Sequence, residues 1–236
     1  MGIDVLQWQD NINWSEVKKA GVEFVMIRVG YRGSAVAGKL MADPYYKQNI
    51  EGALAAGIKV GVYFFSQAIT VQEAKEEVQF TYNLIKDYNI TYPVAFDSEY
   101  YNSDRDGRAD YLSATQRTLM ANTFCIEMQS LGYKPMVYAS TSFFQTDLQL
   151  SMLTNWQLWV AQYNTVITHK GPYQCWQYTS EYSCAMKSHF RKFGNQSSGT
   201  RKSPILYLMT YPFLFGYLVK TLPHLRCVAV FTNVST

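Results

Sequence analysis

Two acidic residues, Asp97 and Glu99, directly follow the apolar segment Val94-Ala95-Phe96. If that segment is a strand, a spacing of two residues places both carboxylates on one face, about 6–7 Å apart. Carboxylates that converge on one place repel each other, so that one tends to keep its proton while the other stays ionised. This pattern suits general acid catalysis beside an anionic partner. The same short motif also occurs without any catalytic role, so the spacing alone does not decide.

A third carboxylate, Asp4, lies inside the apolar segment Ile3-Asp4-Val5. A buried charge in a strand is costly unless hydrogen bonds satisfy it or a site uses it, and we favour the site. Aromatic residues also occur on or just after several predicted strands: Tyr31, Tyr63, Phe65, Tyr138 and Tyr163. Taken singly, each of these aromatic residues is more typical of a hydrophobic core than of a binding site. Gathered at one rim, they would form a substrate-binding groove for a polymer of sugar rings.

Short apolar segments alternate with helical patterns up to about residue 180. Seven strands are predicted: Ile3–Leu6, Phe24–Val29, Val60–Phe65, Val94–Phe96, Met136–Ala139, Leu158–Gln162 and Cys175–Tyr178. Helices are predicted from near Trp14-Ser15 to Gly21, from the Asp43-Pro44 cap to Gly57, from the Thr70 capping box to about Tyr88, and from the Ser113 capping box to Gly132. This alternation predicts parallel strands with right-handed crossovers. The fold class is therefore α/β, and seven strands in this length favour a barrel, whose active site lies at the carboxyl ends of the strands.

The sequence lacks the motifs of several other enzyme classes. The chain has no GxGxxG and no P-loop, and its three histidines lie away from any serine or cysteine arrangement suited to a triad. No Cys/His cluster has the spacing of a zinc site, so we expect no metal. The run Asp104–Asp110 resembles part of a calcium loop without its glycine and glutamate spacing, and we expect a solvated loop. Cys125 lies in an apolar helical run and is predicted to be a buried thiol.

Composition divides the chain near residue 181. The 48% hydrophobic and 16% aromatic content excludes a disordered chain. Residues 1–181 contain all 18 acidic residues and 14 basic ones, a net charge of −4, whereas residues 182–236 contain no acidic residue and seven basic ones. The apolar run at 204–219 is short for a membrane span and is broken by Pro212 and Gly216. We expect no membrane span, and no signal peptide is visible at the first residues.

Several segments, in order, resemble the glycoside hydrolase family 25 lysozymes: Gly2–Gln9, Ile12–Trp14, Phe24–Gly30, Asn49–Ala53, Gly61–Phe65, Pro93–Glu99, Gly132–Tyr138, Leu158–Tyr163 and Trp176–Ser180. The resemblance covers residues 2 to about 181. It implies a TIM-like (β/α)5(β)3 barrel that cleaves the β-1,4 bond between N-acetylmuramic acid and N-acetylglucosamine without a cofactor. It also implies that Glu99 is the general acid, that Asp97 orients the substrate N-acetyl group or stabilises an oxazolinium-like intermediate, and that Asp4 supports them.

The chain departs from this family after Ser180. The family continues to a last strand with a Val-Asp-x-Asn-like motif, but residues 182–236 contain no aspartate. We therefore expect the last strand to be missing or altered; Cys227–Phe231 is apolar enough for a strand, without a prediction that it closes the barrel. Two interpretations of residues 182–236 stay open: a genuine basic, apolar appendage that contacts the wall or a membrane surface, or out-of-frame translation after a frameshift, which the abrupt break favours.

We therefore predict a lysozyme (N-acetylmuramidase) of the endolysin or autolysin type, with residues 1–181 as its catalytic domain. Its expected partner is bacterial peptidoglycan rather than nucleic acid, and we expect a monomer. It would act on the cell wall, either released from the cytoplasm as an endolysin or as a domain of a secreted protein. Two alternatives remain: a catalytically impaired glycan-binding protein, and a glycosidase that acts on chitin-like polymers.

Overall fold

The computed structural model describes residues 1–179 and 226–230. The predicted 182–236 segment therefore lies outside the described residues, apart from the backbone of one short strand. The strands are β1 (Gly2–Val5), β2 (Phe24–Arg32), β3 (Leu40–Ala42), β4 (Lys59–Phe65), β5 (Val94–Asp97), β6 (Pro135–Ser140), β7 (Gln157–Ala161), β8 (Cys175–Thr179) and β9 (Arg226–Val230).

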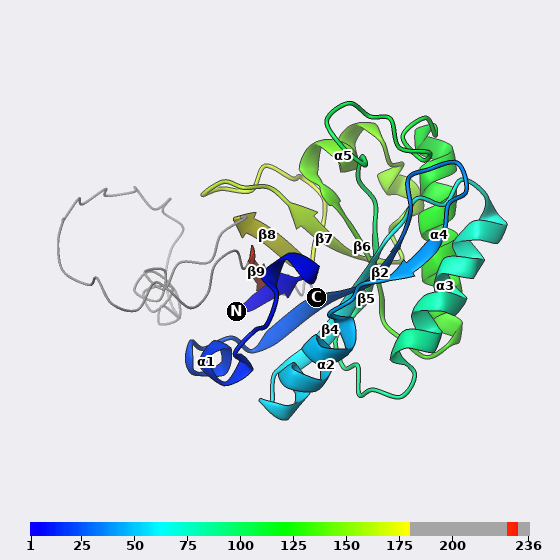
Figure 1. Ribbon diagram of the computed structural model, residues 1–236. Coiled ribbons are helices and arrows are strands. Elements are labelled where there is room, and N and C mark those ends of the chain that lie inside the picture. Colours follow the sequence, from blue (N-terminus) through cyan, green and yellow to red (C-terminus); the bar gives the residue numbers. More distant parts are fainter. Residues whose placement is uncertain (180–225, 231–236) are drawn as a thin grey trace, which may run out of the picture.

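The strands form one curled sheet that closes on itself (Figure 1). Parallel pairing runs from β1 through β2, β4, β5, β6 and β7 to β8. The strand β9 then pairs antiparallel with both β8 and β1, with Asp4 opposite Arg226 in the register. The α/β barrel class is confirmed, and β9 takes the place that the sequence left open. The short β3 is antiparallel to the end of β2 and forms a hairpin with it.

Five α-helices and two short 3-10 helices connect the described strands: η1 (Gln7–Gln9), α1 (Trp14–Lys19), α2 (Tyr46–Ala55), α3 (Val71–Ile85), α4 (Ala114–Ser130), α5 (Thr141–Thr146) and η2 (Leu150–Met152). Two predicted caps are present, because Thr70 accepts the Glu73 N–H and Ser113 accepts the Gln116 N–H. Within the described residues, no helix combines the length and the apolar character that crossing a bilayer requires.

The predicted cap at Asp43-Pro44 is wrong. The helix α2 begins at Tyr46, two residues later than expected. The Asp43 carboxylate is fully buried; it accepts the Tyr45 backbone N–H at 3.0 Å, just before the helix, and also Arg28 Nε at 2.9 Å. A buried carboxylate needs a cationic or hydrogen-bonding partner, and here Arg28 and the turn that precedes α2 both supply one.

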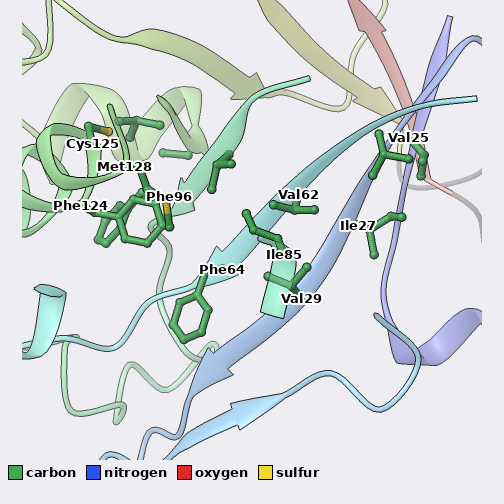
Figure 2. Close-up of a cluster of buried hydrophobic side chains, with 14 of the residues drawn as sticks. Val25, Ile27, Val29, Val62, Phe64, Ile85, Phe96, Phe124, Cys125 and Met128 are labelled. Carbon is green, nitrogen blue, oxygen red and sulfur yellow. The ribbon is translucent and has the colours of Figure 1, made fainter. Parts of the chain in front are cut away.

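Alternation along the strands separates two apolar layers. Val25, Ile27 and Val29 of β2 point outward with Val62 and Phe64 of β4 (Figure 2). They pack under the helices against side chains of α3 and α4, including Ile85, Phe124, Cys125 and Met128. Cys125 is fully buried, which confirms the predicted buried thiol, and burial raises its pKa.

The alternate residues point into the barrel. Here lie Phe24 and Met26 of β2, Met136 of β6, Trp159 of β7 and Cys175 of β8. They fill the barrel with apolar atoms on the side away from the carboxyl ends of the strands. Further along the same inward face, towards the carboxyl ends of the strands, the residues become polar. The barrel is therefore a packed core with a polar mouth.

Candidate active site

A cavity of about 500 Å³ opens at the carboxyl ends of the strands, where a barrel is expected to hold its site. The three predicted acids, Asp4, Asp97 and Glu99, all line it. Asp4 and Asp97 are nearly inaccessible, with exposed fractions of 2% and 3%. The first cavity is completed by these residues: Leu6, Gln7, Trp8, Arg28, Tyr31, Tyr63, Phe65, Tyr101, Asn102, Tyr138, Trp159 and Gln177.

A bulge in β2 brings two polar-ended side chains to the first cavity. Arg28 and Tyr31 are three residues apart, which in a regular strand would place them on opposite faces. The register between β2 and β4 shifts between Arg28 and Gly30, so one extra residue restores both to the inner face. The Arg28 guanidinium then lies 5.1 Å from the centre of the Tyr31 ring. The bulge thus places a guanidinium group and an aromatic ring in the cavity that also contains the carboxylates.

Gln177 of β8 ties the acid of the first strand to two tyrosines. Its amide Nε2 donates to Asp4 Oδ2 at 2.8 Å. Its Oε1 accepts the hydroxyls of Tyr138 at 2.9 Å and Tyr163 at 3.1 Å. Because the Asp4 carboxylate accepts hydrogen bonds, the amide NH2 group faces Asp4, and the amide oxygen is left to accept the two hydroxyls. Gln177 therefore fixes the position of Asp4.

Aromatic rings form the floor of the first cavity. The Trp159 ring meets Tyr138 at 4.5 Å and Tyr63 at 5.8 Å, both edge to face. Burial raises the pKa of Tyr138, and the nearby negative charges of Glu99, Asp97 and Asp4 raise it further. Tyr138 therefore remains a neutral hydrogen-bond donor at any ordinary pH.

A second cavity of about 530 Å³ lies beside the first and shares Glu99 and Tyr138 with it. Tyr163 lines this second cavity and not the first, and its ring is half exposed. The other four predicted aromatic residues, Tyr31, Tyr63, Phe65 and Tyr138, line the first cavity. Glu99 accordingly stands at the boundary between two hollows.

The chain after Glu99 is clamped from outside the barrel. The Tyr100 hydroxyl donates to Asp147, and its ring packs edge to face on Phe143 at 5.0 Å. The Arg105 guanidinium lies 4.1 Å from the centre of the same ring. Tyr100 is the neighbour of Glu99, so these contacts limit the movement of the backbone that carries the acid.

The loop at Asp104–Asp110, expected to be solvated, is exposed only at Asp104–Asp106, and its second half is anchored inward. Arg108 forms two hydrogen bonds to the Glu73 carboxylate, at 2.9 and 2.7 Å. Although burial opposes it, the hydrogen bond and charge of Arg108 lower the pKa of Glu73. Asp110 accepts the backbone N–H groups of Tyr101 and Gly107. The loop is therefore held to α3 while its tip remains exposed.

Several residues that line the first cavity were not singled out from the sequence, among them Trp8, Arg28, Trp159 and Gln177. Trp8 follows the first strand, and its exposed fraction of 67% marks it as a surface platform. Arg28 was hidden by the bulge, which breaks the alternation of the strand. Trp159 and Gln177 lie within apolar strand segments that resemble plain core. Ala161 of β7 and Cys175 of β8 face the barrel interior. Counting every second residue from them along each strand predicts that Trp159 and Gln177 also face inward.

A family model confirms what this geometry suggests. The model described as glycosyl hydrolases family 25 matches residues 3–186. The chain belongs to this family. The match includes Asp4, Asp97 and Glu99, and it ends five residues after the change in composition at residue 181.

Two curated lysozymes are similar to this family 25 chain. The autolytic lysozyme of Clostridium acetobutylicum is 28% identical over 162 residues, which cover 69% of this chain and 44% of that protein. Lysozyme M1 of Streptomyces globisporus is 30% identical over 190 residues, which cover 76% of this chain and 61% of that protein. The chain thus spans roughly half the length of these relatives.

Solved structures share the barrel of this family 25 chain. The modular autolysin LytC of Streptococcus pneumoniae, solved in complex with a synthetic peptidoglycan ligand, is 29% identical with a TM-score of 0.66. The match covers 76% of this chain and 42% of that protein. A family 25 glycosyl hydrolase from Bacillus anthracis, 21% identical with a TM-score of 0.62, shares the fold over 76% of this chain and 78% of that one.

Proposed function

We propose that this chain is a muramidase that hydrolyses the β-1,4 bond between N-acetylmuramic acid and N-acetylglucosamine in bacterial peptidoglycan. The observation that carries the proposal is the convergence of Asp4, Asp97 and Glu99 on one aromatic-lined cavity in a family 25 barrel. The similarity to two lysozymes supports the same substrate class.

The chemistry follows from the placement of the acids. Glu99, at the boundary of the two cavities, protonates the glycosidic oxygen as the bond breaks. Positive charge then develops on the sugar in the first cavity, beside Asp97 and Asp4. Asp97 orients the N-acetyl group or stabilises the cationic intermediate, while Gln177 keeps Asp4 in place. Water then bonds to the anomeric carbon and loses its proton to a carboxylate of the site, which completes the hydrolysis. Arg28 is paired with the buried Asp43, so it contributes hydrogen-bond donors without excess positive charge.

Analysis of the released ends tests this function. Purified bacterial cell walls are digested, the products are reduced with borohydride, and the reduced sugar is identified by mass spectrometry. A muramidase yields fragments that end in reduced muramic acid. Fragments that end in reduced glucosamine would contradict the proposal.

Two further arms separate the alternatives. Chitin digested as fast as cell walls would indicate a glycosidase of chitin-like polymers. Folded protein that sediments with walls but releases nothing would indicate a glycan-binding protein. Residues 226–230 contain no carboxylate at the last strand, which is the specific observation behind that second candidate.

Trp8 should act as an exposed platform for a sugar ring. We expect Trp8→Ala to raise KM for soluble glycan strands by about tenfold with little change in kcat, as loss of an exposed aromatic anchor costs on the order of 1–2 kcal/mol. Steady-state kinetics on purified strands measure this. Tyr111→Ala is the matched control, because Tyr111 is 79% exposed and lines neither cavity. An equal KM in parent and Trp8→Ala would exclude the platform role.

We also propose that residues 1–181 are the catalytic unit and act on the cell wall, after release from the producing cell or export from it. The family match and the change in composition at the same region support this boundary. Sequencing the coding DNA through codon 182 tests the frameshift interpretation. A Val-Asp-x-Asn motif in another frame would support it, and its absence from all frames would leave the appendage interpretation.

A further inference from the structure

Glu99 lies just beyond the regular part of its strand. The pairing of β5 with β6 ends at Asp97 opposite Tyr138, and the Ser98 N–H still donates to the Tyr138 carbonyl at 3.0 Å. Glu99 is the next residue. A side chain on a loop is held less precisely than one on a strand, so the position of the Glu99 carboxylate depends also on what fixes the residue that follows, Tyr100.

Tyr100 is held by a partner on another element. Its hydroxyl donates to Asp147 Oδ1, and the hydroxyl of Thr146 donates to the other oxygen, Oδ2, at 2.6 Å. Asp147 ends α5, and its N–H donates to the Phe143 carbonyl at 2.8 Å. The carboxylate is therefore fixed in direction as well as in place. Burial raises the pKa of Tyr100 and the hydrogen bond to Asp147 raises it further, so the hydroxyl keeps the proton that this bond requires.

A buried cation lies beside this pair. Arg117 of α4 is 4% exposed, and its guanidinium carbon lies 5.2 Å from the centre of the Tyr100 ring and 5.1 Å from that of Phe143. Its Nη2 donates to the Asp110 carbonyl at 2.8 Å. Burial lowers the pKa of Arg117, while the negative charge of Asp147 raises it. Since a guanidinium stays charged in a protein, its attraction to Asp147 and its packing on the Tyr100 ring together link α4, α5 and the chain after β5.

We propose that Tyr100, through its hydrogen bond to Asp147, is a positioning residue for the general acid Glu99. This inference rests on the proposed muramidase function and adds to it a residue outside both cavities. Because Tyr100 lines neither cavity, it acts through the backbone of Glu99 and not on the sugar. A displacement of about 1 Å at a reacting group can cost a factor of about 100 in rate. The bond to Asp147 limits that displacement.

The first measurement compares kcat and KM of Tyr100→Phe and the parent on soluble glycan strands. Phenylalanine keeps the ring and its packing but has no hydroxyl for Asp147. We expect kcat to fall about tenfold while KM stays within about twofold of the parent value. Tyr88→Phe is the matched control. Tyr88 also donates to a carboxylate, Glu51 Oε1 at 3.3 Å, but lines neither cavity, so this variant should keep the parent kcat.

A second substrate shows whether the loss passes through the acid. In the nitrophenyl β-glycoside of N-acetylglucosaminyl-N-acetylmuramic acid, the leaving phenolate is stable enough to depart without a proton. A displaced Glu99 should therefore leave its hydrolysis nearly unchanged, in Tyr100→Phe as in Glu99→Gln. General damage to the site would slow both substrates equally. Equal losses on the two substrates, or an unchanged kcat on the strand, would overturn the positioning role and leave the muramidase function standing.

Variants of the partner complete the test. Asp147→Asn keeps an oxygen that accepts the Tyr100 hydroxyl and should retain most of the parent kcat, whereas Asp147→Ala should lower kcat as Tyr100→Phe does. The double variant Tyr100→Phe, Asp147→Ala should be no slower than either single variant, since the same bond is lost in all three. Losses that multiply in the double variant would contradict action through this bond. A parent that hydrolyses neither substrate would refute the muramidase function and this proposal with it.

Discussion

The Glu99→Gln variant is expected to digest bacterial cell walls about a thousand times more slowly than the parent, the usual range for loss of a general acid being 10²–10⁴-fold. Glutamine keeps the size and the hydrogen-bonding capacity of the side chain but has no proton to give to the glycosidic oxygen. The fall should appear in kcat, because the amide still fills the boundary between the two cavities. Turbidity clearing of purified walls measures the rate.

Two controls make this result specific. Glu51→Gln changes a half-exposed carboxylate on α2, outside both cavities, and should clear walls at the parent rate. The Glu99→Gln protein should still sediment with walls, since binding does not need the proton. A folded Glu99→Gln variant that kept more than a tenth of the parent rate would assign the acid to another residue.

The Glu77→Gln variant should change how stability depends on pH. Glu77 of α3 is fully buried, and it accepts Arg32 Nε at 2.9 Å and the Ser66 hydroxyl at 2.7 Å. Burial raises its pKa from 4.5 to about 7, against the opposing effects of Ser66 and Arg32. The folded state therefore keeps a proton between pH 4.5 and 7 that the unfolded state has already released. The parent's free energy of unfolding must fall as pH rises through this window.

Glutamine does not titrate, so the variant lacks this contribution. The difference in unfolding free energy between parent and variant should be largest near pH 4.5, and should shrink by about 3 kcal/mol by pH 7.5, at 1.36 kcal/mol for each pKa unit. Urea unfolding at several pH values measures it. Glu76→Gln removes a half-exposed partner of Arg32. Its difference in unfolding free energy from the parent should not decrease in this way between pH 4.5 and 7.5. A constant difference for Glu77→Gln would mean that the folded protein keeps this carboxylate ionised.

Local signals made the barrel predictable. Apolar runs such as Val60–Phe65 and capping residues such as Ser113 report on strands and helices within a few residues of themselves. The helix expected to begin at Pro44 begins two residues later, at Tyr46. The Asp43 carboxylate accepts the nearby Tyr45 N–H but also Arg28, fifteen residues earlier, and this second partner is set by tertiary structure. The pairing of β9 with β1 is likewise non-local, and no short pattern announces it.

The acids of the site were predictable because charges stand out in apolar strands. Asp4 interrupts β1, Asp97 ends β5, and Glu99 follows two residues later, at the edge where a barrel has its active site. Gln177 and Trp159 were not found, since an amide or an indole inside an apolar strand resembles core. The bulge that brings Arg28 to the cavity breaks the two-residue alternation of side chains along β2. A prediction that relies on this alternation therefore does not find it.

The hydrogen bond from Gln177 to Asp4 joins residues 173 positions apart. Contacts of such sequence separation form late, because the entropy of closing a long loop must be met before they stabilise anything. The helices, in contrast, depend on neighbours a few residues away. During folding, secondary structure can therefore be largely in place while the carboxylates are still apart. We therefore expect catalytic activity to appear only at the end of folding, when β1 and β8 come together around the cavity.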